Sequence, residues 1–323
     1  MRKIKWGVLG TANIALKQVI PAMNMAENCE LYGIAGRDRE KVDRFGELFG
    51  FKKKFYSLED MLDDPEIEAV YIPLPNNLHK EWVIKAAEKG KHILCEKPLA
   101  ANESDVRDMI TACDNAGVKF MEAFAYLHSP IIRAVKEALD SGVIGVPGFI
   151  ETTFLTSGYS AENIRVQRDT LGGGVYDLGC YNISLILTLL DEEPSMVKAF
   201  ARFTNEQIDD FASAYMEFPS GCRTSIVTGM CSPQRSDRFF IHGSKGTIEA
   251  PIPFNACGRL SYDVVEGDKT TTYYVETPNN YKLEVEQLGR CISDGEDPYV
   301  SHKFSIRNAR AIDQVLIEMG YRN

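Results

Sequence analysis

The stretch Gly90-Lys-His-Ile-Leu-Cys-Glu-Lys-Pro-Leu-Ala100 decides the fold prediction for this chain. Its residues 92–95 form an apolar run of strand length, and Glu96 and Lys97 follow directly before a proline that cannot continue a strand ladder. Ligands bind at the carboxyl ends of strands in open parallel α/β sheets. The two charges are therefore a candidate for chemistry, although a solvated strand end is the commoner explanation of such a pair when it stands alone.

Length and composition limit the classes of protein that need to be considered. The chain has 323 residues, enough for two domains, with 44% hydrophobic and 25% charged residues, as in folded soluble proteins. Its net charge of -10 argues against nucleic acid or an anionic membrane as a partner. The eight cysteines show no close pairing, so we expect reduced thiols in a cytoplasmic protein and no metal site.

The beginning of the chain predicts a strand, a glycine turn and a helix. Residues 4–9 are an apolar strand, and apolar residues return at helical spacing from residue 14 to residue 23. The turn approximates a dinucleotide fingerprint, in which the backbone approaches a pyrophosphate at a helix N-terminus. Its candidate cofactor residues are Gly10, Thr11, Ala12, Asn13 and Ile14. Ala12 stands where the fingerprint has its second glycine, so the motif by itself is weak.

A second buried strand, residues 31–35, ends in Gly36 and Arg37, and a helix is predicted for residues 39–49. The residue that closes this strand meets the adenosine ribose in such folds, where an arginine accommodates a 2′-phosphate. Arg37 and Lys41 therefore favour NADP over NAD. Two alternatives remain. Arg37 and Lys41 could simply be solvated residues at the start of the helix, and Asp38 could cap the helix or repel the phosphate by its negative charge.

A third predicted strand, residues 68–74, runs into a turn with four candidate cofactor contacts: Leu74, Pro75, Asn76 and His79. Strands and helices then alternate as far as another buried strand, residues 118–123. Such alternation predicts a doubly wound parallel sheet over residues 1–125.

The second half of the chain, residues 126–323, follows another pattern. Two hairpin signals, in residues 211–229 and 239–249, lie in a region without helices between residues 196 and 276. This predicts an α+β domain with a large, open, mainly antiparallel sheet. Before it, Gly172-Gly-Gly174 precedes a predicted helix on which Asp177 and Tyr181 are four residues apart and share one face. A capping aspartate and a half-buried tyrosine would explain them equally well.

Taken together, these stretches resemble the Gfo/Idh/MocA family of NAD(P)-dependent enzymes, which includes glucose-fructose oxidoreductase and inositol dehydrogenase. The resemblance rests on five stretches, of which Glu96-Lys97-Pro98 is the most specific: residues 7–15, 75–79, 96–98 and 122–124, and the glycine run with Asp177 and Tyr181. Tyr181 makes the chain look closest to the dihydrodiol and sugar dehydrogenase branch. Leu127 departs from the pattern, since many relatives have an arginine there.

The resemblance implies an NADP-dependent oxidoreductase that transfers a hydride to or from a hydroxyl-bearing carbon of a sugar or cyclic trans-diol, with NAD also possible as cofactor. Lys97 and Tyr181 would handle the proton of the alcohol. Asp177 would bind a hydroxyl or hold Lys97, Arg165 would join the substrate contacts, and Glu96 would contact the nicotinamide side of the cofactor. The family also implies a homodimer or higher oligomer built on the open sheet.

Two alternatives belong to other classes. A regulatory protein of the same fold would sense the dinucleotide without turnover, and it would not need both Lys97 and Tyr181. A reductase of a large planar tetrapyrrole would need a wide apolar cleft in place of Arg165 and Asp177.

Overall fold

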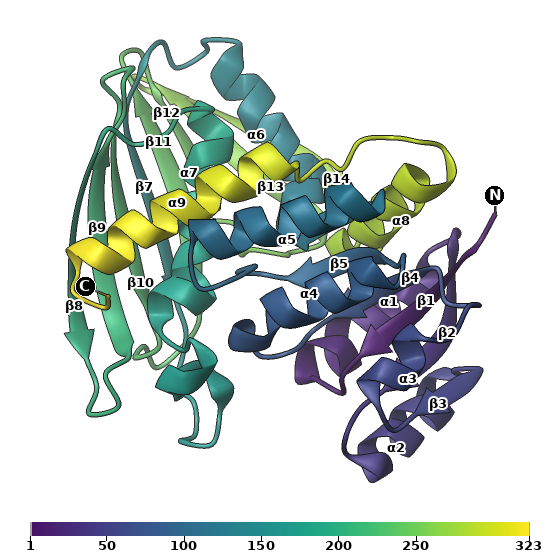
Figure 1. Cartoon of the computed structure of the whole chain (residues 1–323). Coiled ribbons are helices and arrows are strands. Elements are labelled where there is room, and N and C mark those ends of the chain that lie inside the picture. The colour runs from purple at the N-terminus through teal and green to yellow at the C-terminus, as the bar shows by residue number, and fades with distance from the viewer. Residues whose placement is uncertain (1, 323) are drawn as a thin grey trace. The chain divides into compact units, whose positions relative to one another are not determined.

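A computed structural model describes residues 2–322 (Figure 1). The chain forms two compact units, one of residues 2–125 and 279–306, the other of residues 126–278 and 307–322. The boundary after residue 125 is also the limit expected from the sequence. Residues 279–306, which the sequence grouped with the second range, belong to the first unit.

The first unit is built on a parallel sheet of six strands in the order β3-β2-β1-β4-β5-β6. The strands are β1 (Ile4–Leu9), β2 (Cys29–Ala35), β3 (Lys53–Phe55), β4 (Ala69–Ile72), β5 (His92–Glu96) and β6 (Phe120–Ala123). The order reverses between β1 and β4, which is the switch point where ligands bind in doubly wound sheets. The predicted fold class is confirmed. The short, polar strand β3 was not predicted, because three residues at a sheet edge carry little periodic signal.

Helices cover both faces of this sheet (Figure 1). They are η1 (Ala15–Val19), α1 (Ile20–Met25), α2 (Arg39–Phe49), α3 (Leu58–Leu62), η2 (Asn76–Leu78), α4 (His79–Glu88), α5 (Glu103–Ala116), α8 (Asn280–Ser293) and the first residues of α9 (His302–Glu318). Helices α1 and α8 pack against each other and against β2, whereas α4 packs on α5, β4 and β5. Asn102 caps α5, because its side-chain oxygen accepts a hydrogen bond of 2.8 Å from the Asp105 N–H.

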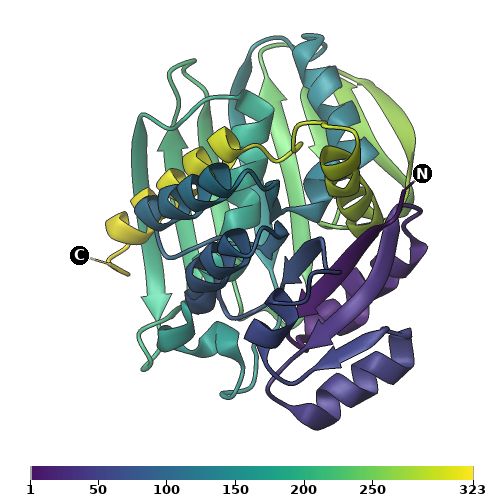
Figure 2. The same cartoon turned by 45° about the vertical axis from the view of Figure 1, so that its right-hand side comes forward.

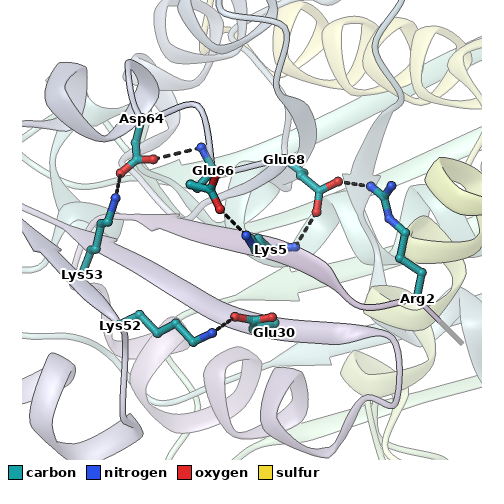
Figure 3. Close-up of polar contacts among 8 residues, drawn as sticks. All are labelled: Arg2, Lys5, Glu30, Lys52, Lys53, Asp64, Glu66 and Glu68. Carbon is teal, nitrogen blue, oxygen red and sulfur yellow. Dashed lines mark hydrogen bonds and ion pairs between the residues drawn. The ribbon is translucent and has the colours of Figure 1, made fainter.

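The amino-terminal edge of the sheet is crossed by ion pairs (Figure 3). The pairs are Arg2–Glu68, Lys5–Glu66, Lys52–Glu30 and Lys53–Asp64, the last with a distance of 2.7 Å. The charges at this edge are thus matched within the unit, and each pair has one solvent-exposed member, so the pairs contribute little to stability. The candidate ligand residues lie at the opposite, carboxyl-terminal edge.

The second unit contains a sheet of eight strands in the order β14-β13-β12-β11-β7-β10-β9-β8. The strands are β7 (Pro147–Leu155), β8 (Met196–Phe203), β9 (Asp209–Glu217), β10 (Arg223–Gly229), β11 (Ser236–Gly243), β12 (Thr247–Ala250), β13 (Gly258–Glu266) and β14 (Lys269–Thr277). Only the β7–β10 pair is parallel. The mainly antiparallel sheet expected from the sequence is confirmed.

The helical segments of the second unit are η3 (Ala125–His128), α6 (Pro130–Asp140), η4 (Ile164–Val166), η5 (Arg168–Thr170), η6 (Val175–Gly179), α7 (Cys180–Leu190) and the remainder of α9 from residue 307. Helices α6 and α7 pack on the sheet, as Figure 2 shows. The stretch Arg168–Leu190 is long and apolar enough for a membrane span, but 83% of its most apolar window is buried inside the protein. It is therefore a core helix of the second unit.

Candidate active site

Three strand ends of the first unit meet around Gly10. The Gly10 N–H donates to the Ala35 carbonyl oxygen at the end of β2, at 2.8 Å. Gly10 has φ +123°, and a Cβ there would lie 3.2 Å from Leu74 Cδ2. A Cβ at Gly36 would lie 3.4 Å from Thr11 Cγ2. The structure thus brings Gly10, Thr11, Gly36 and Leu74 together, and the two glycines permit this close packing at the ends of the strands.

Asp38 and Lys41 form the start of α2. The Asp38 carboxylate accepts a hydrogen bond of 3.1 Å from the Lys41 N–H, so the capping alternative for Asp38 is correct. The Lys41 ammonium lies 3.4 Å from the same carboxylate. Arg37 is exposed, and within residues 2–322 it has no ion-pair partner. Arg37 is therefore the cation at the end of β2 that is available to an anionic ligand.

His79 lies inside the first unit. Its side chain is fully buried, with Nδ1 2.9 Å from the Pro98 carbonyl oxygen and Nε2 2.8 Å from the Leu74 carbonyl oxygen. At least one of these contacts is an N–H···O hydrogen bond. The sequence predicted His79 as a direct contact of the cofactor. Because the ring is buried between two turns, it instead joins the Leu74 turn to the turn that follows Lys97.

Strand β5 ends at Glu96, and Lys97 follows it in the turn; both residues are half-buried. The Tyr71 hydroxyl donates to Glu96 Oε1 at 2.5 Å. Burial, and then the charge of Glu96, raises the pKa of Tyr71, so its phenol stays protonated as a donor. The buried Tyr71 hydroxyl thereby holds the Glu96 side chain in place at the carboxyl end of β5.

Arg165 and Asp177 meet in the second unit. Arg165 Nε lies 2.9 Å from Asp177 Oδ1, and the Tyr159 hydroxyl lies 3.5 Å from Asp177 Oδ2. The Arg165 guanidinium also lies over the Tyr159 ring, 5.4 Å from its centroid. The Asp177 charge raises the pKa of Arg165. The sequence predicted Arg165 and Asp177 as neighbouring substrate contacts but gave no sign of Tyr159.

Tyr181 stands in a cluster of aromatic rings. The centroids of Tyr126, Phe154 and Phe254 lie 5.5, 5.4 and 5.2 Å from that of Tyr181. Phe254 is held in place because its N–H donates to Asp237 at 2.5 Å. The sequence did not indicate this cluster, since its members come from four segments that are far apart in the chain.

Helix α7 and the π-helical turn η6 are anchored at the glycine run. The Val175 N–H donates to Asp209 Oδ2 at 2.8 Å, and the Tyr321 hydroxyl donates to the Gly172 carbonyl oxygen at 2.6 Å. A Cβ at Gly173, where φ is +126°, would lie 2.2 Å from Asp209 Oδ1. Gly173 and Gly174 therefore permit close packing against Asp209, and Gly172 permits close packing against the carbonyl oxygens of Arg165 and Gln167. This packing fixes the helix that bears Asp177 and Tyr181.

Two family models match the chain. The one described as "Oxidoreductase family, NAD-binding Rossmann fold" covers residues 4–124, and the "GFO/IDH/MocA C-terminal domain" covers residues 132–249. D-xylose 1-dehydrogenase (NADP(+)) 2 of Haloferax volcanii is 33% identical over 96% of this chain and 95% of its own length. The trans-1,2-dihydrobenzene-1,2-diol dehydrogenase of Xenopus laevis is 28% identical over 98% of both.

A solved structure is similar over the same extent. It is a 3-ketoreductase from Actinomadura kijaniata in complex with NADP and TDP-benzene, 27% identical, with a TM-score of 0.93 over 98% of both chains. The fold and the carboxyl-edge turns define a dinucleotide-binding oxidoreductase. The chain belongs to the Gfo/Idh/MocA family of NAD(P)-dependent oxidoreductases.

Proposed function

We propose that the chain is an NADP-dependent oxidoreductase that acts on a hydroxyl-bearing carbon of a sugar or cyclic trans-diol. The observation that carries the proposal is the position of Tyr181, in an aromatic cluster and one helical turn from the Arg165–Asp177 ion pair. The charged groups of the ion pair can form hydrogen bonds with substrate hydroxyl groups, and the aromatic rings can pack against the apolar face of a six-membered ring. The names of the xylose and dihydrobenzene-diol dehydrogenases agree with this class of substrate.

The turn after β1 lies at the switch point where the strand order reverses, and this position supports the proposal that a dinucleotide binds there. The first turn would hold the pyrophosphate through Gly10, Thr11, Ala12, Asn13 and Ile14. Gly36, Arg37 and Lys41 would hold the adenosine 2′-phosphate, and Leu74, Pro75, Asn76, Glu96 and Lys97 would line the rest of the site, with His79 shaping the turn. The bound nicotinamide would supply or accept the hydride.

Tyr181 would give a proton to the substrate oxygen during reduction and take it back during oxidation. Lys97, from the first unit, would orient the substrate hydroxyl and favour the tyrosinate by its positive charge. Asp177 and Arg165 would hold neighbouring hydroxyl groups. The side chains of the protein thus do the proton chemistry and the positioning.

Two further features belong to the proposal. The strand residues Phe200 and Tyr274 are 77% and 62% exposed, which supports a homodimer or higher oligomer formed through the open sheet. All eight cysteines lie within residues 2–322 and are free thiols, which supports a cytoplasmic location.

The proposal is tested by following NADPH absorbance with a panel of aldoses, ketoses and cyclic trans-diols. The expected result is turnover with at least one polyhydroxylated substrate, and a turnover about 10² to 10⁴ lower in Lys97→Met. Tight NADPH binding without turnover on any member of the panel would favour a regulatory dinucleotide sensor instead.

A further inference from the structure

Phe254 lies in a loop without regular secondary structure, residues 251–257, which joins β12 to β13. The Ala256 N–H donates to the Pro253 carbonyl oxygen at 3.0 Å, which closes a turn with Phe254 at its second position. Asn255 follows with φ +62°, in the left-handed conformation that asparagine tolerates. Because the loop lies outside the strands, its position depends on contacts with other elements, and these bury Phe254 to 6% exposure.

Two of these contacts come from the beginning of β11. Asp237 Oδ2 accepts a hydrogen bond of 2.5 Å from the Phe254 N–H, and Arg235 Nη2 donates to the Phe254 carbonyl oxygen at 2.8 Å. Arg235 and Asp237 also bind each other through two hydrogen bonds, from Nε to Oδ1 at 2.8 Å and from Nη2 to Oδ2 at 2.6 Å. We refer to this pair as the Arg235–Asp237 clamp, since it binds both backbone polar groups of Phe254.

The register of the sheet brings the clamp to Phe154 as well. Asp237 of β11 is paired with Phe154 of β7, and paired residues of antiparallel strands point to the same face of a sheet. The Arg235 guanidinium lies 5.0 Å from the centroid of the Phe154 ring. The rings of Phe154 and Phe254 are stacked, with 5.2 Å between their centroids. The clamp therefore contacts both phenylalanines of the aromatic cluster.

The burial of Asp237 distinguishes the clamp from an ordinary surface ion pair. The Asp237 side chain is 1% exposed, whereas that of Arg235 is 50% exposed. A buried carboxylate is costly unless it is paired and hydrogen-bonded, and the two Asp237 oxygens accept three hydrogen bonds from Arg235 and Phe254. Exposed ion pairs contribute little, but a change in this buried pair should move the groups that it binds.

We propose that Arg235 and Asp237 are positioning residues for Tyr181, because they hold the two phenylalanine rings that pack on the Tyr181 ring. The centroids of Phe154 and Phe254 lie 5.4 and 5.2 Å from that of Tyr181. Aromatic pairs prefer edge-to-face and offset arrangements, so two fixed neighbours restrict the orientation of the third ring. The inference rests on the proposed function, in which the Tyr181 hydroxyl exchanges a proton with the substrate.

The environment of Tyr181 can be measured without substrate or cofactor. Protein labelled with ¹³C at the tyrosine Cε atoms is observed by NMR, and the Tyr181 signal is assigned from its loss in Tyr181→Phe. Phe154 and Phe254 lie close enough to displace this signal by their ring currents. Phe254→Leu removes one of these rings and shows the displacement that its loss causes.

Asp237→Asn should displace the Tyr181 signal in the same direction as Phe254→Leu. Asparagine has one oxygen for the three donors that the carboxylate serves, so the clamp can no longer make all of its contacts. Arg235→Met combined with Asp237→Leu removes all four hydrogen bonds and leaves no buried charge without a partner. This double variant should therefore fold, and it should give a larger displacement than Asp237→Asn.

Asp210→Asn is the matched control. Arg202 and Asp210 join β8 and β9 of the same sheet through two hydrogen bonds of 2.8 Å, and their side chains are 62% and 26% exposed. The Tyr181 signal should keep its wild-type position in this variant. An unchanged Tyr181 signal in Arg235→Met/Asp237→Leu would overturn the proposal, even with a lower stability in urea, because the clamp would then be structural only.

Kinetics give a second readout if the enzyme has turnover. The double variant should lower kcat about tenfold or more, because a misplaced catalytic group can cost about 10²-fold. The dissociation constant of NADP should stay the same, since its candidate contacts lie in the first unit. A wild-type kcat in the double variant would overturn the proposal. Absence of turnover in the wild type, together with a displaced Tyr181 signal in the double variant, would contradict only the proposed function.

Discussion

Arg165 Nε and Asp177 Oδ1 lie 2.9 Å apart, in an ion pair that joins the loop before the glycine run to the helix after it. The Arg165 carbonyl oxygen also accepts a hydrogen bond of 2.9 Å from the Gly173 N–H. Arg165 therefore makes two contacts with this part of the chain. Its carbonyl oxygen binds the Gly173 N–H, and its side chain binds Asp177. Asp177 has 11% of its side chain exposed, so losing the pair would leave a carboxylate that is nearly buried.

Arg165→Gln and Asp177→Asn should each lower kcat/KM for the substrate about 10- to 100-fold, because a charged hydrogen bond contributes roughly 1.5–3 kcal/mol. The dissociation constant of NADP should stay the same, since its candidate contacts lie in the first unit. Steady-state kinetics and a cofactor titration check this. Arg202→Gln, which breaks the exposed Arg202–Asp210 pair, is the control and should change neither value. Full activity in both site variants would contradict the substrate role.

Lys97→Met and Tyr181→Phe should each reduce kcat by about 10² to 10⁴ while folding and NADP affinity are largely kept. The double variant should be little worse than either single one, because coupled catalytic groups act as a unit. Single-turnover and steady-state rates of the three variants check this. Near-normal turnover in Lys97→Met would show that Lys97 has no catalytic role and is an ordinary solvated residue at the end of a strand.

Arg37→Ala should weaken NADP binding about tenfold or more and leave NAD binding nearly unchanged, because only NADP has the 2′-phosphate that a guanidinium binds. Titrations with both cofactors measure the two affinities. Arg44→Ala, another exposed arginine of the same region, serves as the control. Equal losses of NADP and NAD affinity in Arg37→Ala would show that Arg37 does not select the cofactor.

Asp209→Asn should change how stability depends on pH. Burial raises the pKa of Asp209 from 3.8 to about 7 in the folded protein. The folded chain then keeps a proton that the unfolded chain releases, so stability is lost as the pH rises from about 4 to about 7, by up to ~1.4 kcal/mol per pH unit. Asparagine does not titrate, so the stability of Asp209→Asn relative to wild type should increase between pH 5 and pH 8. Urea unfolding across this range measures it, and a difference that does not change with pH would refute it.

Light scattering at micromolar concentration should show a dimer or larger species, above the 36.1 kDa of one chain. Phe200→Glu places a charge on the exposed face of β8 and should shift the protein toward the monomer, because a charge is costly to bury in an apolar interface. Leu48→Glu, a substitution at a 59% exposed residue of α2, should not. A wild-type protein that is only monomeric would rule out the interface.

The sequence determined the elements whose signals are local. The strand before Glu96, the helix cap at Asn102 and the hairpins of the second unit follow from periodicity and turn residues within a few positions of each other. The spacing of Asp177 and Tyr181 placed both on one helix, and their motifs together identified the family.

Only the tertiary structure decided which distant residues surround those motifs. Tyr126, Phe154 and Phe254 meet Tyr181 because separate strands and helices pack their side chains into one core, and no local pattern encodes that choice. His79 was predicted as a cofactor contact because its turn lies at the carboxyl edge of the sheet, whereas in the structure its ring is buried between the carbonyl oxygens of Leu74 and Pro98. Glu122 lies beside Cys95 because β5 and β6 pair in one register, which is set by the packing of the whole sheet.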